Sequence, residues 1–184
     1  MSPDLPPTLA KLALPCFAIA AVLAITRWRG LSWTDDIGLV WPRPAVTATW
    51  VAIWIGWVVL GEFAVRTFGL AQAAPWKPYP LLIIVLRIVA IGLLGPAAEE
   101  IVIRGVLFYR IGLTRLGPIG AIVIGAALWA VAHVQYDGMT MLLIFLDGLV
   151  LGTARLKSRS TFVPIVMHAL GNLASIYQSL AGGP

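Results

Sequence analysis

Charged residues are scarce in this sequence. They make up 11% of the 184 residues, while 60% are hydrophobic and the mean hydropathy is +0.92; an ordinary soluble domain has roughly 25% charged residues. So few Asp, Glu, Lys and Arg side chains cannot form the polar shell of a water-soluble globule, and the apolar excess must therefore face lipid. We expect a single integral membrane domain over residues 1–184.

The sequence has almost no cysteine and no basic residues at its N-terminus. A single cysteine, Cys16, excludes an intrachain disulfide framework. Residues 1–8 contain no Lys or Arg, unlike the start of a secretory signal peptide, and Arg27 and Arg29 stand where a small-residue cleavage site would follow the first apolar block. We interpret that block as a retained membrane helix.

Acidic residues are fewer than basic ones, 8 against 13, which gives a net charge of +5 and a pI near 9.9. The basic residues lie in short stretches between apolar blocks and not on one polar face, so we expect no nucleic-acid partner. This distribution is typical of the positively charged cytoplasmic loops of membrane proteins.

Long apolar blocks dominate what is present. Each is close to the ~20 residues that cross a hydrocarbon core as a helix, and none shows the period-2 alternation of a barrel strand. The fold class that we expect is all-α, a polytopic transmembrane bundle of about six to seven membrane helices. The blocks cover residues 9–26, 45–61, 81–97, 119–134, 139–154 and 161–180, and the expected extramembrane loops are 28–44 and 72–80.

The segment 81–113 is longer than one straight crossing needs, because as a single helix it would span roughly 50 Å. Gly95-Pro96 marks the expected break, since proline removes one helical hydrogen bond and clashes with the preceding turn. The helix should kink there or restart with Pro96 in its first turn. The sequence leaves open whether the segment crosses once or folds back.

The orientation in the membrane depends on that crossing. With one crossing, eight basic residues share a side against three, so the eight lie inside and both termini outside. If the segment folds back, the N-terminus moves inside and the loops 110–115 and 155–159 are still cytoplasmic, so these two loops are the only ones with the same assignment in both cases. The eight are Arg27, Arg29, Arg43, Arg110, Arg115, Arg155, Lys157 and Arg159, and the three are Lys11, Arg66 and Lys77.

Charged side chains occur inside the apolar blocks, where insertion costs at least ~2.5 kcal/mol near the bilayer centre. Glu100 and Arg104 are four residues apart, which puts them on one helix face in the favourable order for an ion pair. Glu99 is rotated by about 100° from that face and lacks this partner. The pattern predicts a structural acid, Glu100, and a second acid, Glu99, that is free for proton chemistry.

Both histidines of the chain fall in apolar blocks. His133 follows Trp129 by four residues near a helix end, where it could equally be an interfacial histidine. His168 and Asn172 are aligned on one helix face, and Gly171 between them permits close helix approach. The two histidines and the carboxamide together favour a common polar cluster.

Two further intramembrane charges are not assigned to catalysis. Arg87 is expected to snorkel, to line a substrate path or to pair with an acid. Asp147 is expected to pair with an arginine or to support the site. Gly148 and Gly152 have the spacing of a helix-packing motif.

Three motifs, Glu-Glu-x-x-x-Arg, aromatic-x-x-x-His and His-x-x-x-Asn, follow one another on successive apolar blocks. Their conjunction resembles the CPBP family of intramembrane proteases, which includes the type II CAAX prenyl endopeptidases and the Abi proteins that process bacteriocins. The resemblance covers residues 81–180, with Trp129 where phenylalanine is usual. The two additional N-terminal helices expected within 9–61 resemble nothing diagnostic.

The resemblance implies a general base assisted by a histidine, an oxyanion-stabilising pair and a supporting ion pair. The resemblance makes Glu99 the general base, with His133 assisting it. It makes His168 and Asn172 the oxyanion-stabilising pair, and Glu100 and Arg104 the supporting ion pair. The implied reaction hydrolyses a peptide bond of a membrane-associated protein or peptide, such as a CAAX-like tail, a leader or a C-terminal sorting segment. The implied location is a prokaryotic inner (cytoplasmic) membrane, and the oligomeric state stays open.

A metal-dependent mechanism is the alternative. Glu99, His133 and His168 offer the two-histidine, one-carboxylate ligand set of a catalytic zinc ion. We favour a mechanism without a cofactor, because the sequence has no His-Glu-x-x-His motif and the carboxamide of Asn172 suits an oxyanion better than zinc. A small transporter and a non-catalytic immunity protein on the same scaffold are the other classes left open.

Overall fold

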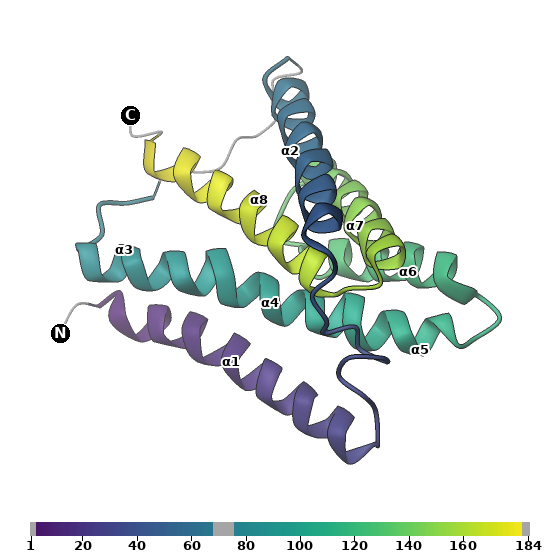
Figure 1. Ribbon diagram of the computed structural model, residues 1–184. Helices are drawn as coiled ribbons and strands as arrows, with labels where there is room; N and C mark the ends of the chain where they lie inside the picture. Colours follow the sequence, from purple (N-terminus) through teal and green to yellow (C-terminus); the bar gives the residue numbers. More distant parts are fainter. Residues whose placement is uncertain (1–2, 68–75, 182–184) are drawn as a thin grey trace.

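The computed structural model describes residues 3–67 and 76–181, so residues 72–75 of the predicted loop 72–80 lie outside the described residues. Within these ranges every regular element is a helix, which confirms the predicted all-α class. The start of α1 and the end of α8 lie at the same end of the bundle (Figure 1). In chain order, with η for a π-helical stretch, the elements are α1 (Leu5–Trp28), α2 (Pro44–Thr67), α3 (Leu81–Arg87), η1 (Ile88–Leu94), α4 (Gly95–Glu100), η2 (Ile101–Leu107), α5 (Phe108–Gly112), α6 (Gly117–Val131), α7 (Gly138–Ser158) and α8 (Phe162–Ala181).

Four of the described helices are long and apolar enough to cross a membrane, which makes the chain an integral membrane protein. They are Leu5–Trp28, Pro44–Thr67, Leu81–Gly112 and Gly138–Ser158. Helix α6 is apolar but has only 15 residues, and α8, with 20 residues, is not one of the four. The expectation of six to seven crossings stays a prediction.

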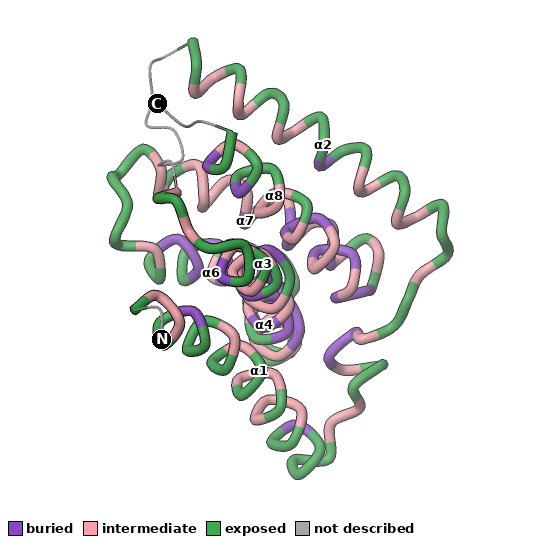
Figure 2. Tube along the Cα trace, turned by 90° about the vertical axis from the view of Figure 1, so that its left-hand side faces the viewer, coloured by how far each residue is buried: buried purple, intermediate pink, exposed green. Residues whose placement is uncertain are grey.

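The chain does not leave the helix at Gly95-Pro96, but a new helical segment, α4, begins there with Pro96 in its first turn, which is one of the two predicted forms. Elements α3 to α5 form one continuous helix of 32 residues, Leu81–Gly112, in which only the hydrogen-bond pattern changes. Seen end-on, this helix occupies the middle of the bundle, and it packs against α1, α6 and α8 (Figure 2). The segment therefore passes through the bundle once, and the fold-back alternative is wrong.

A π-helical turn accommodates Pro96. The N–H of Gly95 donates to the carbonyl of Ala90, five residues earlier, as in the wide turn of a π-helix. Pro96 is the second residue of α4, in the first helical turn, where its missing N–H and fixed φ are tolerated. In the same pattern the donor for the Ile91 carbonyl would be the N–H of residue 96, which proline lacks. The helix therefore continues with one carbonyl oxygen left for another donor.

Contacts between distant segments define the two ends of the bundle. At the end where the chain begins, Lys77 forms an ion pair with Asp4. At the other end, the loop between α1 and α2 is bonded to the turn before α8, where Thr161 Oγ1 donates to the Ile37 carbonyl over 2.6 Å. The loops with the predicted cytoplasmic arginines share this second end (Figure 1). Their cytoplasmic orientation stays a prediction.

The buried core joins α2, α6, α7 and α8. Gly148 and Gly152 on α7 permit close packing on α6, as their spacing predicts, because a Cβ added at Gly148 would lie 2.8 Å from the Cβ of Ala126. The core residues are Trp54, Trp129, Leu151, Ala154, Val163 and Met167.

Candidate active site

Trp129, on α6, lies at the centre of the polar cluster. Its indole Nε1 donates a hydrogen bond of 2.6 Å to Glu99 Oε2. Its ring meets the rings of His133 and His168 edge-on, with centroid distances of 5.5 and 5.0 Å. The guanidinium of Arg104 lies 4.9 Å from the centre of the same ring. One buried aromatic side chain thus contacts four residues of the predicted site.

Glu100 and Arg104 form the predicted ion pair in the interior. Arg104 Nη1 donates to Glu100 Oε1 over 2.8 Å, and the two side chains are 2% and 0% exposed. The same carboxylate oxygen lies 2.9 Å from His168 Nδ1. Arg104 Nη2 also donates to the Gly148 carbonyl over 3.2 Å, which ties the pair to α7. Removal of either partner would leave an uncompensated charge in apolar surroundings.

The partners of the two histidines determine which ring nitrogen carries hydrogen. The Trp129 carbonyl, 2.8 Å from His133 Nδ1, can only accept, so Nδ1 carries the hydrogen and the neutral ring has a free lone pair on Nε2. An ionised Glu100 also only accepts, so Nδ1 of His168 carries hydrogen. Nε2 of His168 then donates only when the ring is an imidazolium. The two rings are therefore suited to different tasks.

Asn172 is held by the carbonyl that Pro96 leaves unbonded. Its Nδ2 donates to the Ile91 carbonyl oxygen over 2.8 Å. Asn172 is half-buried and lies one turn after His168 on α8, as the sequence spacing predicts. The second hydrogen of Nδ2 remains for another acceptor.

Glu99 and His133 share a neighbour without bonding to each other, within the part of the chain that the structure describes. Glu99 Oε2 faces the indole N–H of Trp129, and His133 Nδ1 faces the backbone carbonyl of the same residue. Both side chains are half-buried. A water molecule that contacts both residues would therefore lie beside Trp129.

The three residues considered as zinc ligands, Glu99, His133 and His168, surround Trp129 but are not grouped closely enough to bind one metal ion. In residues 3–67 and 76–181, no three His, Cys, Asp or Glu side chains are grouped so that they could hold a metal ion. Glu99 is bonded to Trp129, and His168 presents Nδ1 to Glu100. The donor atoms as arranged do not fit a zinc site.

Two contacts of the intramembrane charges were not predicted. Trp57 on α2 donates a hydrogen bond of 2.7 Å to Asp147 Oδ1, so Asp147 pairs with an indole and not with an arginine. Arg87 lies over the rings of Trp76 and Tyr79, at 5.1 and 4.7 Å from their centroids, and pairs with no acid among the described residues. The tryptophans are the sequence feature that could indicate these contacts, because a buried indole N–H needs an acceptor such as a carboxylate.

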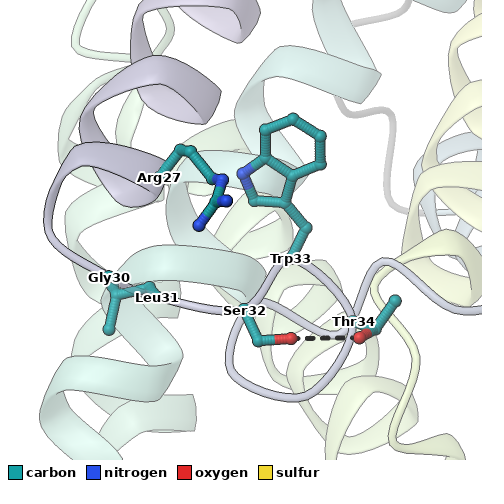
Figure 3. A pocket seen from close by; sticks show the side chains of 6 residues that line it. All are labelled: Arg27, Gly30, Leu31, Ser32, Trp33 and Thr34. Atoms are coloured by element: carbon teal, nitrogen blue, oxygen red, sulfur yellow. Dashed lines mark hydrogen bonds between the residues drawn. The ribbon is translucent and has the colours of Figure 1, made fainter.

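A pocket of about 430 Å³ lies at the end of α1 and the following loop (Figure 3). The side chains of Arg27 and Trp33 lie close together there, and the hydroxyls of Ser32 and Thr34 are 3.0 Å apart. None of the predicted site residues lines this pocket. It is therefore separate from the candidate active site.

The fold and the cluster define an all-helical integral membrane protein with buried Glu, His, Arg and Trp side chains at one site. Residues 79–174, more than half of the chain, match the family described as type II CAAX prenyl endopeptidase, Rce1-like. The chain belongs to this family of intramembrane proteases, which confirms the resemblance seen in the motifs.

One curated relative is an uncharacterized 24.3 kDa protein of Escherichia coli, 26% identical over 147 residues. The aligned region covers 74% of this chain and 66% of the relative, so the chain spans slightly less than two thirds of the relative's length. No solved structure matches.

Proposed function

We propose that this protein is an intramembrane endopeptidase that hydrolyses a peptide bond of a membrane-associated protein or peptide. The observation that supports this proposal best is that Trp129 contacts Glu99 and both histidine rings. It thereby places a carboxylate and two imidazole side chains around one residue. Membership of a protease family supports the same reaction class. The presence of all four motif residues favours an enzyme over a non-catalytic protein on this scaffold.

Glu99 is the proposed general base. Trp129 occupies Oε2, which leaves Oε1 of this half-buried carboxylate to bind a water molecule. His133 assists through the lone pair on Nε2. As Glu99 takes a proton from the water, the water oxygen bonds to the carbonyl carbon of the scissile peptide. The proton then passes to the amide nitrogen as the C–N bond breaks.

His168 and Asn172 are the proposed oxyanion donors. Negative charge develops on the carbonyl oxygen as its carbon becomes tetrahedral, and fixed N–H donors stabilise that charge. Glu100 accepts from Nδ1 of His168 at 2.9 Å, which orients the ring so that Nε2 of an imidazolium can donate to the oxyanion. Arg104 in turn balances Glu100. The opposite charges of Glu100 and Arg104 compensate each other, which limits the cost of burying this pair.

The proposed substrate is a segment attached to or embedded in the bilayer, either a CAAX-like tail, a leader or a C-terminal sorting segment. The family description favours the first of these. The proposed compartment is a prokaryotic inner membrane, with the arginine-rich loops in the cytoplasm as the positive-inside rule predicts.

A processing assay tests the proposal. The purified protein in vesicles is incubated with farnesylated CAAX peptides and unmodified membrane peptides, and the products are identified by mass spectrometry. We expect wild type to cleave at least one peptide, and Glu99→Ala, His133→Ala and His168→Ala to fold and insert without cleaving it. Glu62→Ala, which removes a partly exposed acid of α2, is the matched control and should cleave normally.

Normal cleavage by all three site variants would contradict the roles given to these residues. Solute or ion flux through the vesicle membrane, with no cleavage of any peptide, would favour a transporter instead.

A further inference from the structure

Trp54 is the only buried residue of α2, a helix that is described throughout, and it lies against the candidate active site. Its side chain is 3% exposed and belongs to the core cluster that contains Trp129 and Met167. A Cβ added at Gly171 would lie 3.2 Å from Trp54 Cζ2 and 3.5 Å from Trp54 Nε1. The indole edge that carries the N–H therefore faces α8 at Gly171.

Gly171 lies between the two proposed oxyanion donors on α8. His168 precedes it by three residues, a spacing that puts both on neighbouring positions of one helix face, and Asn172 follows it directly. A side chain at residue 171 would force the indole of Trp54 to give way, because its Cβ would be only 3.2 Å from the ring. The glycine thus allows the indole N–H to lie beside the donor pair.

The Trp54 Nε1 atom is a buried donor without an acceptor among the described residues. Buried polar groups nearly always have a partner, so an unbonded one needs an explanation. Trp57, three residues further along α2, has its indole N–H bonded to Asp147 at 2.7 Å. The same helix therefore bonds one indole N–H to a carboxylate and leaves the other, which is also buried, without an acceptor among the described residues.

We propose that the indole N–H of Trp54 is a third hydrogen-bond donor to the carbonyl oxygen of the scissile peptide bond, beside His168 and Asn172. This inference rests on the proposed protease function. The donor lacks an acceptor oxygen, and the backbone carbonyl of a peptide substrate supplies one. Trp54 is the only fully buried residue of α2, and Trp50, Trp57 and Val58 pack partly buried on the same core, so the binding of a peptide backbone at Trp54 requires a small shift of α2.

Helix α2 precedes residues 79–174, the part of the chain that matches the family. Trp54 would therefore be a substrate contact that the N-terminal part of this chain adds to the motif residues. A motif comparison restricted to the matched region cannot detect it.

The test compares the kcat and KM of wild type, Trp54→Phe and a protein with benzothienylalanine at position 54, which keeps the shape of the indole without its N–H. The probe is the peptide that wild type cleaves fastest among farnesylated CAAX peptides and unmodified membrane peptides. We expect kcat to fall about 100-fold, as for loss of one oxyanion donor, while KM stays near the wild-type value. The Tm of the isosteric protein should not fall, because no existing hydrogen bond is lost.

Trp50→Phe is the matched control, since Trp50 lies one turn earlier on α2 and packs partly buried on the same core. It should keep the wild-type kcat. An unchanged kcat in the isosteric protein, with Glu99→Gln inactive, would overturn the role of Trp54 alone. An equal loss in Trp50→Phe would also overturn it, because the effect would then come from packing. If wild type cleaves no peptide, the protease proposal and this inference fail together.

Discussion

The side-chain amide of Asn172 donates a hydrogen bond of 2.8 Å to the carbonyl oxygen of Ile91. In the π-helical pattern of this segment, that oxygen would accept from the N–H of residue 96, and Pro96 has none. The proline thus creates a free acceptor inside an apolar helix, and a side chain of α8 satisfies it. Pro96 is therefore a positioning residue for a proposed oxyanion donor.

Replacement of Pro96 by alanine should release Asn172, because the new backbone N–H competes for the Ile91 carbonyl. We expect kcat to fall by roughly 10²-fold, the effect of a catalytic group displaced by about 1 Å. The Tm should stay equal or rise, since alanine favours a helix interior. Steady-state kinetics and thermal melts in detergent measure both quantities.

Asn172→Ala is the companion variant for Pro96→Ala. If both act through one hydrogen bond, the double variant should lose no more activity than the worse single variant. Losses that multiply in the double variant would show that Pro96 and Asn172 act independently.

Replacement of Glu100 by glutamine should impair both folding and catalysis. The change leaves Arg104 buried without its counter-charge, which should lower the free energy of unfolding by about 3–5 kcal/mol. It also replaces the carboxylate that accepts from His168 Nδ1 and orients this proposed oxyanion donor, so kcat should fall by roughly 10²-fold. Glu62→Gln, in a partly exposed pair with Arg66, should cost about 0–1 kcal/mol. Wild-type stability in Glu100→Gln would contradict the buried-pair account.

The elements that could be predicted from sequence are those set by local spacing. Each of the six apolar blocks overlaps a helix, and the four-residue spacing of Glu100 and Arg104 does give an ion pair. The continuity of Leu81–Gly112 could not be predicted in this way. It depends on a π-helical turn before Pro96 and on a donor from α8, which is distant in sequence.

The contacts of the candidate site that join distant segments could not be predicted from local spacing either. The motifs identify Glu99 and His133, but the link between them is Trp129, which bonds Glu99 through its indole and His133 through its backbone carbonyl. Trp54, the proposed third donor, and Trp57, the partner of Asp147, both lie on α2, outside every motif. Side-chain pairing between helices far apart in the chain leaves no periodic signal in the sequence.

Trp129→Phe separates the hydrogen bond of this tryptophan from its packing. Phenylalanine, the usual residue in the family that the motif resembles, keeps a ring beside His133 and His168 but cannot donate to Glu99. A hydrogen bond to a charged group contributes about 1.5–3 kcal/mol, so kcat should fall by roughly 10–100-fold with the fold retained. Kinetics and a melt check this. A wild-type kcat would show that the indole does not position Glu99.

Asp137 caps α7 outside the membrane-spanning segments and should make stability depend on pH. Its carboxylate accepts from the Thr140 hydroxyl and from the N–H groups of Thr140 and Met139, and these hydrogen bonds lower its pKa in the folded protein. The stabilisation is complete above the unfolded-state pKa of about 3.9 and is lost as the pH falls through the lower folded-state value. Asp137→Ala should therefore lower Tm at pH 7, with the difference shrinking in acid.

Asp137→Asn is the control for this cap, because asparagine keeps an acceptor oxygen but does not titrate. The difference in Tm between Asp137→Asn and Asp137→Ala should therefore stay the same as the pH is lowered. Thermal melts between neutral pH and about pH 3, below the model-peptide value, make the comparison. Equal Tm values for wild type and Asp137→Ala at neutral pH would contradict the capping role.

We propose that two adjacent carboxylates have different tasks, proton transfer for Glu99 and ion pairing for Glu100. The kcat of Glu99→Gln against wild type tests it most directly. Glutamine keeps the shape and can still accept from Trp129 Nε1, but it cannot take a proton from water. We predict an unchanged Tm with kcat lowered by roughly 10²–10⁴-fold. Cleavage by Glu99→Gln at the wild-type rate would contradict the account.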